Sequence, residues 1–303
     1  MSNTHRSRSR RPKLSRVLGC CVAALATVAL AAPHAVAQDG EPGKRTRDMT
    51  LDGFGDLIAR HNNGNLLVYP HSGQFDGENT FTEPPATIGE GWNGYDWLGV
   101  ADVTGDGNAD AIGRNPQTSE LVAFPHSGDW NDGNPLGQEP VSFGFGWNGL
   151  NRLVFQDFTG DGVADVAGRV AGTGQIQLYS NNGEGGLEAP SPYADGFPNS
   201  TWIEAADLNG NGTPELLARG PNGVVWAQVD GSSRVVTLER GWNQYNAITM
   251  KDLDGGGVES LVARVAGSND VVAFPYQGTL DGENTFGDPV RLKPNWNHVS
   301  VII

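Results

Sequence analysis

The sequence is poor in cysteine. Its two cysteines, Cys20 and Cys21, are adjacent and lie in an N-terminal segment that we interpret below as an export signal. Without that segment the chain has no thiol for a disulfide bond or for nucleophilic catalysis. Its order must then come from core packing, with or without bound metal.

Positive charge is also scarce. The chain has 20 Lys and Arg against 35 Asp and Glu, a formal net charge of −15, and six of the basic residues lie in the N-terminal segment. Nucleic-acid binding needs a basic face, and anionic membrane surfaces attract basic segments. We therefore expect no nucleic-acid partner and no membrane insertion, but a soluble protein that attracts cations.

Motifs of catalysis are missing from the sequence. It has no nucleophile elbow, no H-E-x-x-H and no P-loop. A His-Ser-Gly sequence occurs twice, at residues 71–73 and 126–128. Because a catalytic group needs to occur only once, this repetition indicates a structural turn. We therefore expect no enzyme, although loop residues from different repeats could still converge.

Long apolar stretches are limited to residues 17–32, which are too few and wrongly flanked to span a membrane. A basic segment without acids precedes them, and residues 35–37 (Ala-Val-Ala) fit small-residue cleavage before Gln38. We interpret residues 1–37 as a signal peptide and residues 38–47 as a polar linker. The sequence thus predicts a secreted, extracellular protein.

The export route is less constrained than export itself. Arg10-Arg11 leaves twin-arginine export open, but Pro12-Lys13 lacks the apolar residue that usually follows, which favours the Sec route. The long basic start and the Ala-rich stretch resemble actinobacterial secretion signals.

Five acidic loops of one kind occupy the rest of the chain. They begin at residues 48, 102, 157, 207 and 252, which are 54, 55, 50 and 45 residues apart. The clearest copies read D-V-T-G-D-G-N-A-D at 102–110 and D-F-T-G-D-G-V-A-D at 157–165. A period of about 40–50 residues is typical of propellers and solenoids.

Each repeat contains four short β-favouring segments. In the second repeat these are residues 95–101, 109–114, 120–124 and 141–145, with turn residues between them, which is the content of one propeller blade. The first repeat lacks its leading segment, and residues 298–303 can supply it. The sequence predicts an all-β fold for residues 48–303: a five-bladed β-propeller of four-stranded blades, closed by the C-terminal strand completing the first blade.

An arginine ends the second strand of every repeat. We expect it to act inside the blade, for instance by pairing with a loop carboxylate, because buried charges are usually paired. The five residues are Arg60, Arg114, Arg169, Arg219 and Arg264.

The loop pattern, followed later by Phe-Gly-Asp-Pro-Val at 286–290, resembles the bacterial FG-GAP/VCBS repeat, which is related to the blades of integrin α-subunit propellers. The resemblance covers residues 48–303. Members of the family usually have seven blades, whereas this chain has repeats for five. In architecture alone, five blades of this length resemble tachylectin-like lectins.

The acidic loops are candidate calcium sites, since Ca²⁺ is bound by carboxylate, carbonyl and water oxygens. The alternative is that Asp closes each turn through its own side chain, as in Asx-turns. We expect the fifth loop to be empty, because Gly256 and Ser260 replace two acids. The candidate ligands at positions 1, 3, 5 and 9 are Asp48, Asp52, Asp56, Asp102, Thr104, Asp106, Asp110, Asp157, Thr159, Asp161, Asp165, Asp207, Asn209, Asn211 and Glu215.

A Trp-Asn pair is the second repeated feature. The indoles could pack between neighbouring blades, where a large aromatic buries much area. Alternatively, Trp stacks on a sugar while Asn supplies directed hydrogen bonds, and repetition would raise avidity. The candidate ligand-binding residues are Trp92, Asn93, Trp147, Asn148, Trp242, Asn243, Trp296 and Asn297.

These features favour a binding protein. The leading hypothesis is a secreted, calcium-stabilised, lectin-like propeller that binds cell-surface or cell-wall glycans. The alternative is a protein-binding subunit of a secreted assembly, because a lone propeller resembles lectin-like accessory subunits of antibacterial umbrella-toxin particles. A secreted hydrolase is the third possibility.

Overall fold

The computed structural model describes residues 47–82, 84–183 and 185–303. The predicted signal peptide, residues 1–37, and residues 38–46 of the predicted linker lie outside this part. Arg47, the last residue of the predicted linker, is buried. The propeller therefore includes at least this residue.

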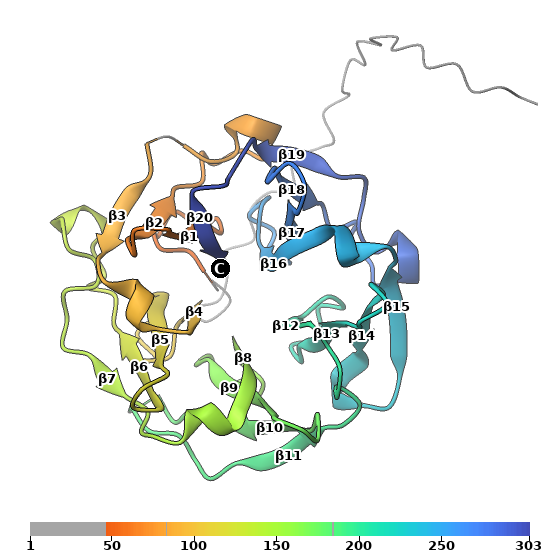
Figure 1. Cartoon of the computed structure of the whole chain (residues 1–303), viewed down its shortest axis with the longest axis horizontal. Coiled ribbons are helices and arrows are strands. Elements are labelled where there is room, and N and C mark those ends of the chain that lie inside the picture. Colours follow the sequence, from red (N-terminus) through yellow and green to blue (C-terminus); the bar gives the residue numbers. More distant parts are fainter. Residues whose placement is uncertain (1–46, 83, 184) are drawn as a thin grey trace, which may run out of the picture. The chain divides into compact units, whose positions relative to one another are not determined.

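Five four-stranded antiparallel sheets form a ring (Figure 1). The first contains β20 (Val299–Ile302), β1 (Leu57–His61), β2 (Leu66–Tyr69) and β3 (Ala86–Gly89). The second contains β4 (Trp97–Ala101), β5 (Asp110–Asn115), β6 (Glu120–Phe124) and β7 (Val141–Ser142), and the third β8 (Leu150–Gln156), β9 (Asp165–Val170), β10 (Ile176–Tyr179) and β11 (Ser191–Ala194). The fourth contains β12 (Trp202–Ala206), β13 (Glu215–Arg219), β14 (Val225–Gln228) and β15 (Val235–Glu239), and the fifth β16 (Tyr245–Lys251), β17 (Ser260–Val265), β18 (Val271–Phe274) and β19 (Val290–Lys293).

Short 3₁₀ turns connect these strands. Three of them hold the Trp-Asn motifs: η2 (Trp92–Gly94), η4 (Trp147–Gly149) and η6 (Trp242–Gln244). Each is preceded by a glycine with φ between 77° and 99°, a conformation that residues with a Cβ rarely adopt. The other four are η1 (Gly77–Asn79), η3 (Trp130–Asp132), η5 (Val229–Gly231) and η7 (Gly282–Asn284).

The C-terminal strand closes the ring. β20 pairs antiparallel with β1, with Ala59 opposite Ile302 and Arg60 opposite Val301. Closure matters because β1 would otherwise present an unpaired edge. The predicted five blades and their closure by the C-terminal strand are therefore confirmed.

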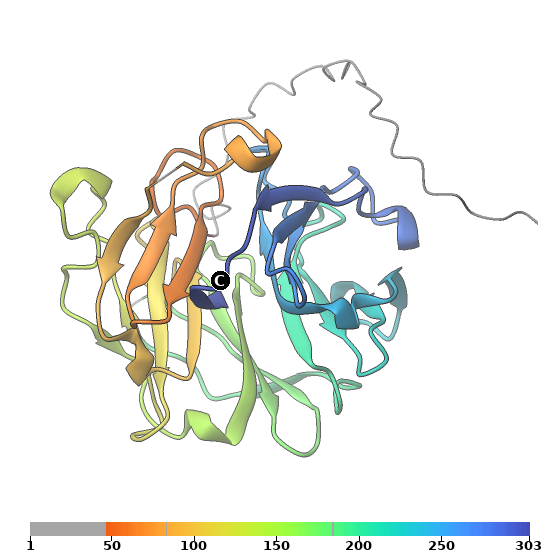
Figure 2. The ribbon, with the colours of Figure 1, turned by 45° about the horizontal axis from the view of Figure 1, so that its top comes forward.

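The first strand of each blade lies nearest the centre of the ring. These inner strands are β20, β4, β8, β12 and β16, while β3, β7, β11, β15 and β19 lie at the periphery (Figures 1 and 2). The inner strands β4, β8, β12 and β16 lead into acidic loops, and the first loop, which precedes β1, contacts the fifth through a backbone hydrogen bond from Gly55 to Asp252, so the five loops gather on one face. The connections that carry the Trp-Asn motifs enter the inner strands at the opposite face.

The core consists of apolar clusters between neighbouring sheets. In one cluster, Val154 of β8 and Ile176 of β10 pack with Ile203 of β12 and Leu216 of β13. Full burial of such a side chain contributes about 1.5–3 kcal/mol. Each blade therefore depends on both neighbours for its stability. Within the described residues, no helix has the length and apolar character needed to cross a bilayer.

Candidate functional site

The acidic loops are tied together by their own carboxylates. In the second loop, the two oxygens of Asp102 accept hydrogen bonds from the backbone N–H groups of Gly105 and Gly107 at 2.7 and 2.8 Å. Asp157 binds Gly160 and Gly162 in the same way in the third loop. Position 1 is therefore a turn-forming acceptor, as the Asx-turn alternative predicts.

In the first three loops, the last acid links the turn to the residues that follow the third strand. Asp110 is fully buried and accepts hydrogen bonds from Val103, Thr104 and His126. Burial is the largest cause that raises its pKa to about 7, and the backbone donors oppose that rise. Asp56 occupies the equivalent place in the first loop, where burial again raises the pKa to about 7.

The second loop also contains an unsatisfied hydroxyl. Thr104 Oγ1 is buried and has no hydrogen-bond partner among the described residues. Its equivalents do have partners, since Thr50 Oγ1 donates to Asp56 and Thr159 Oγ1 contacts Asp157 at 3.5 Å. The hydroxyl oxygen of Thr104 is therefore still available to bind a cation.

Carboxylates do not crowd together in these loops. In the portion of the chain that is described, no three His, Cys, Asp or Glu side chains converge as a metal cluster. A cation would need hydroxyl, carbonyl or water oxygens in addition. In the fourth loop even the neutral ligand candidates are engaged, because the Asn209 amide donates to Glu215 and to Asp230, and Asn211 also donates to Asp230.

The repeated indoles lie inside the protein. Trp92, Trp147, Trp242 and Trp296 are between 2 and 6% exposed. Trp242, for example, packs against Tyr245 and Phe274 with ring centroids 4.8 and 4.7 Å apart. Packing between blades therefore accounts for these four indoles, and they offer no exposed ring on which a sugar could stack.

The asparagines of the same motifs are exposed at the surface. The amides of Asn148 and Asn243 donate to the backbone carbonyls of Pro116 and Pro221. Gly64 lies close to the Asn93 amide, and Asn297 accepts a hydrogen bond from Asn62 through its backbone. The contacts of Asn93, Asn148 and Asn243 hold the motif against the preceding blade, whereas that of Asn297 holds it against the blade that β20 completes.

The arginine that ends each second strand joins two blades. Arg169 Nη1 donates to the carbonyls of Phe197 and Ser200, where the chain enters the next blade, while its Nε donates to Asn151. The same pattern recurs in all five blades, as shown by Arg60, Arg114, Arg219 and Arg264. We call these five residues the rim arginines. The expected pairing with loop carboxylates is wrong, because backbone carbonyls are their main partners.

The two His-Ser-Gly sequences form equivalent turns. The backbone N–H of His71 donates to Asp56, and Gly73 N–H lies 3.0 Å from the Nδ1 of His71. His126 makes the same two contacts with Asp110 and Gly128. Both histidines are therefore part of the turn structure.

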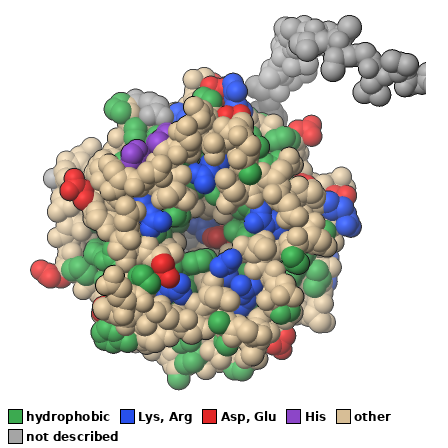
Figure 3. Space-filling view, in the orientation of Figure 1, with side chains coloured by type: hydrophobic (Ala, Val, Ile, Leu, Met, Phe, Trp, Pro, Cys, Tyr) green, Lys and Arg blue, Asp and Glu red, His purple; other side chains and the backbone are tan. Residues whose placement is uncertain are grey.

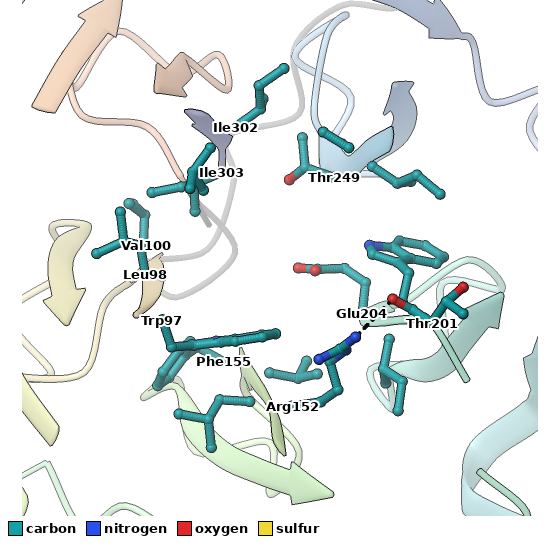
Figure 4. Close-up of a pocket in the computed structure, with 18 of the residues that line it drawn as sticks. Trp97, Leu98, Val100, Arg152, Phe155, Thr201, Glu204, Thr249, Ile302 and Ile303 are labelled. Atoms are coloured by element: carbon teal, nitrogen blue, oxygen red, sulfur yellow. Dashed lines mark hydrogen bonds between the residues drawn. The ribbon is translucent and has the colours of Figure 1, made fainter. Parts of the chain in front are cut away.

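A cavity lies at the centre of the ring, and we call it the central channel. It has a volume of about 340 Å³ and is lined by residues of all five inner strands. None of the predicted metal-ligating or Trp-Asn residues lines it. The wall includes Trp97, Phe155 and Ile302, and Arg152 and Glu204 point into the space from β8 and β12 (Figure 4).

The charges within the channel are unevenly distributed. Arg47 forms ion pairs with Glu204 and Glu259 and donates to the Met250 carbonyl at 2.6 Å. Arg152 lies nearer the entry ends of the inner strands. Its guanidinium is 5.6 Å from the ring centroid of Trp97, and its Nη2 donates to the Thr201 carbonyl at 3.1 Å.

One set of equivalent positions in the channel wall shows why the sequence analysis did not predict the channel. Val301, Trp97, Arg152, Trp202 and Ala247 lie opposite the five rim arginines in their sheets. The repeat pattern requires no common residue here, so a search for shared motifs passes over it. A search for charged or aromatic residues at variable positions of the repeat would have found Trp97 and Arg152.

One part of the chain matches a known protein family. Residues 157–218, from the third acidic loop into β13, match the FG-GAP-like repeat. A search of curated protein sequences found no significant match.

Several solved structures resemble this chain at low sequence identity. A lectin from Agrocybe aegerita, described as specifically recognising non-reducing terminal N-acetylglucosamine, is 19% identical with a TM-score of 0.47, and the match covers 83% of this chain and 80% of that one. The TcdB2–TccC3 structure without its hypervariable C-terminal region is 16% identical with a TM-score of 0.37, covering 80% of this chain but 13% of its own. A Bacteroides caccae protein is 12% identical with a TM-score of 0.37, covering 83% and 86%. Residues 157–218 therefore carry an FG-GAP-like repeat, within a chain whose described residues form a five-bladed β-propeller.

Proposed function

We propose that this protein is a secreted binding module that recognises a glycan at the mouth of its central channel. We define the channel mouth by Asp96, Arg152, Thr201, Asn246 and Ser300, which lie at the entry ends of the five inner strands. Figure 3 shows the propeller face hollowed at its centre. A concave site of this kind is where a small ligand is most easily enclosed.

The lining of the channel supports a sugar as the ligand. Ligand pockets are mostly apolar, with a few placed polar groups, and measure about 300–1,000 Å³. Trp97 and Phe155 supply aromatic surface, while Thr201, Asn246 and Ser300 supply hydroxyl and amide groups. A volume of about 340 Å³ is at the small end of the range and suits a terminal sugar residue.

The pairing of the acidic residues in the channel lining favours binding over catalysis. Among the described lining residues the carboxylates are Asp96 and Glu204, and each is ion-paired, with Arg114 and Arg47 respectively. A glycosidase needs two carboxyl groups flanking the scissile bond. Two acids already held by arginines are poorly placed for that task.

Calcium is proposed for the acidic loops, most strongly for the second. There Asp102, Asp106 and Asp110 belong to the same nine-residue loop as the unsatisfied hydroxyl of Thr104, and all four side chains have oxygens that can ligate calcium. Asp102 and Asp110 already accept backbone hydrogen bonds, so the ion would share their remaining lone pairs. A bound cation would offset the free-energy cost of burying the charged Asp110 carboxylate and would hold the turn in place.

A glycan array tests the proposed function. We expect the protein to bind a restricted set of glycans, and Trp97→Ala to weaken that binding at least tenfold, because an aromatic wall of the site is lost. Asn148→Ala is the matched control: it changes a predicted motif outside the channel and should leave binding unaltered. Thermal melting of both variants checks that they remain folded.

Two outcomes would contradict the proposal. If no glycan binds but other secreted chains co-purify with the protein, the protein-binding alternative is favoured. If a glycan binds and Asn148→Ala abolishes it while Trp97→Ala does not, the site is at the Trp-Asn surface and not in the channel.

A further inference from the structure

The basic residues of the protein are concentrated at one place. Six of the twelve Lys and Arg among the described residues are the rim arginines and Arg152. Basic side chains surround the central opening, and most acidic side chains of this face lie towards its outer edge (Figure 3). A chain with a net charge of −15 thus has a locally positive channel mouth.

Among the described residues, the rim arginines of four of the five blades have no negatively charged partner. Each Nε donates to the residue just before the variable wall position of its own blade. In the second blade that residue is Asp96, which pairs with Arg114 through both oxygens. In the other blades the partner is neutral: Ser300, Asn151, Thr201 and Asn246.

Arg152 adds a further positive charge to this ring. Burial and then the charge of Arg114 lower its pKa, and burial followed by the charge of Arg152 lowers the pKa of Arg169 and of Arg219. Arg152 therefore repels Arg114, Arg169 and Arg219, and the one carboxylate among the five channel-mouth residues, Asp96, is already paired with Arg114. Glu204 lies deeper, on β12, and is already paired with Arg47.

The guanidinium of Arg152 is held in a defined orientation. It lies over the Trp97 ring and is anchored by hydrogen bonds from Nη1 to Asn151 and from Nη2 to Thr201. Arginine pairs with planar carboxylates through two parallel N–H···O bonds, which gives direction as well as attraction. Such an anchored group can select one anion geometry.

We propose that the channel mouth, centred on Arg152, recognises the carboxylate of an acidic sugar residue. The inference rests on the proposed glycan-binding function and specifies its ligand. The carboxylate would pair with Arg152 and be attracted by Arg169 and Arg219. The neutral groups of Thr201, Asn246 and Ser300 would face the sugar hydroxyls. An anion at this place would relieve the repulsion among the four arginines.

The test is calorimetric titration with matched oligosaccharides that end in glucuronic acid or in glucose. We expect the acidic sugar to bind at least tenfold more tightly at low salt, and the preference to shrink as ionic strength rises. Arg152→Gln should remove this preference, so that the acidic and the neutral sugar bind with equal affinity. Arg152→Lys, which keeps the charge but loses the planar fork, should retain only part of it.

Arg240→Gln is the control with the same change of charge. Arg240 is exposed, lies outside the channel lining and pairs with Glu283. This variant should bind both sugars as the unmodified protein does. Melting curves of the three variants show whether any loss of binding reflects loss of the fold.

The outcomes separate this inference from the proposed function. Equal binding of acidic and neutral sugars, or a preference that survives Arg152→Gln, overturns the inference and leaves glycan binding intact. Binding of neither sugar, together with no binding on the glycan array, overturns both. Sulfated or phosphorylated sugars bound as tightly as the glucuronate would refute carboxylate selection. A glutamate-rich peptide that binds in place of every sugar would indicate a protein partner.

Discussion

The two faces of the propeller use charge in opposite ways. On the acidic-loop face the same residues recur in each blade, and their carboxylates accept hydrogen bonds from the adjacent backbone. At the channel mouth the rim arginines recur, but their Nε partners change from blade to blade. The repeated residues hold the ring together, and the variable ones give it an asymmetric centre.

This difference explains why the motifs that stand out in the sequence are structural. A residue needed to join blades is needed five times, because every blade has the same two neighbours. A ligand on the axis of the ring meets all five blades at once, so one Arg152 and one Trp97 are sufficient. This comparison of the two faces can be tested by removing, in turn, residues that join the blades and residues that line the channel.

The largest effect should follow from opening the ring. Removing residues 298–303 deletes β20, which buries Val299 and Ile302 and supplies the Val299 carbonyl to Arg264. It also exposes the edge of β1. We expect the truncated chain to lose its cooperative thermal transition and to aggregate in size-exclusion chromatography.

The control for this truncation changes β20 without removing it. Ser300→Ala deletes a hydroxyl that contacts Arg60 at the exposed side of the strand, which should cost about 1 kcal/mol or less. A truncated chain that melts cooperatively at the same temperature as this control would show that closure by β20 contributes little.

A smaller but still large effect should follow from removing a repeated indole. Trp242→Ala deletes a side chain that is 2% exposed and packs between blades, so the free energy of unfolding should fall by about 3–5 kcal/mol. Trp97→Ala, in the partly exposed channel wall, should cost less. Urea denaturation measures both values.

The effects of these two substitutions on glycan binding should follow the reverse order. Under conditions where Trp242→Ala remains folded, it should bind glycan normally, whereas Trp97→Ala should not. A Trp242→Ala variant that is as stable as the unmodified protein but has lost binding would restore the stacking role first considered for the repeated indoles.

The ring itself was predictable because its evidence is local and repeated. The spacing of the acidic loops gave the number of blades, and the missing first strand, together with Trp296-Asn297, gave the closure. The short β-favouring segments that form the blades also recur at regular intervals, and each of them can be recognised from its own residues. The role of the rim arginines was less accessible, because their partners are backbone carbonyls about 23 to 36 residues further along the chain.

The channel could not be predicted from the same pattern. Its lining comes from five strands spread from Trp97 to Ile302, and the residues that matter have no counterpart in the other blades. The role of the Trp-Asn motifs stayed open between packing and binding for a related reason: the sequence shows that an indole recurs, but not whether its ring is covered. Phe124 and Tyr179, which cover Trp92 and Trp147, each lie 32 residues further along the chain than the indole they contact.

The smallest effect concerns calcium on the acidic-loop face. Extracellular calcium modules bind at about 10⁻⁴–10⁻³ M, so 10 mM Ca²⁺ should stabilise one site by about 1.4 kcal/mol or more. For a domain of this size that corresponds to a rise in melting temperature of about 3–6 °C. Differential scanning fluorimetry with calcium and with EDTA measures it. Asp106→Asn, in the second loop, should reduce the rise, whereas Asp288→Asn removes an exposed acid outside the loops and should not. If calcium leaves the melting temperature unchanged, the backbone hydrogen bonds of Asp102 and Asp110 are sufficient to hold the turn, and the acidic face is a ring of Asx-turns without a metal.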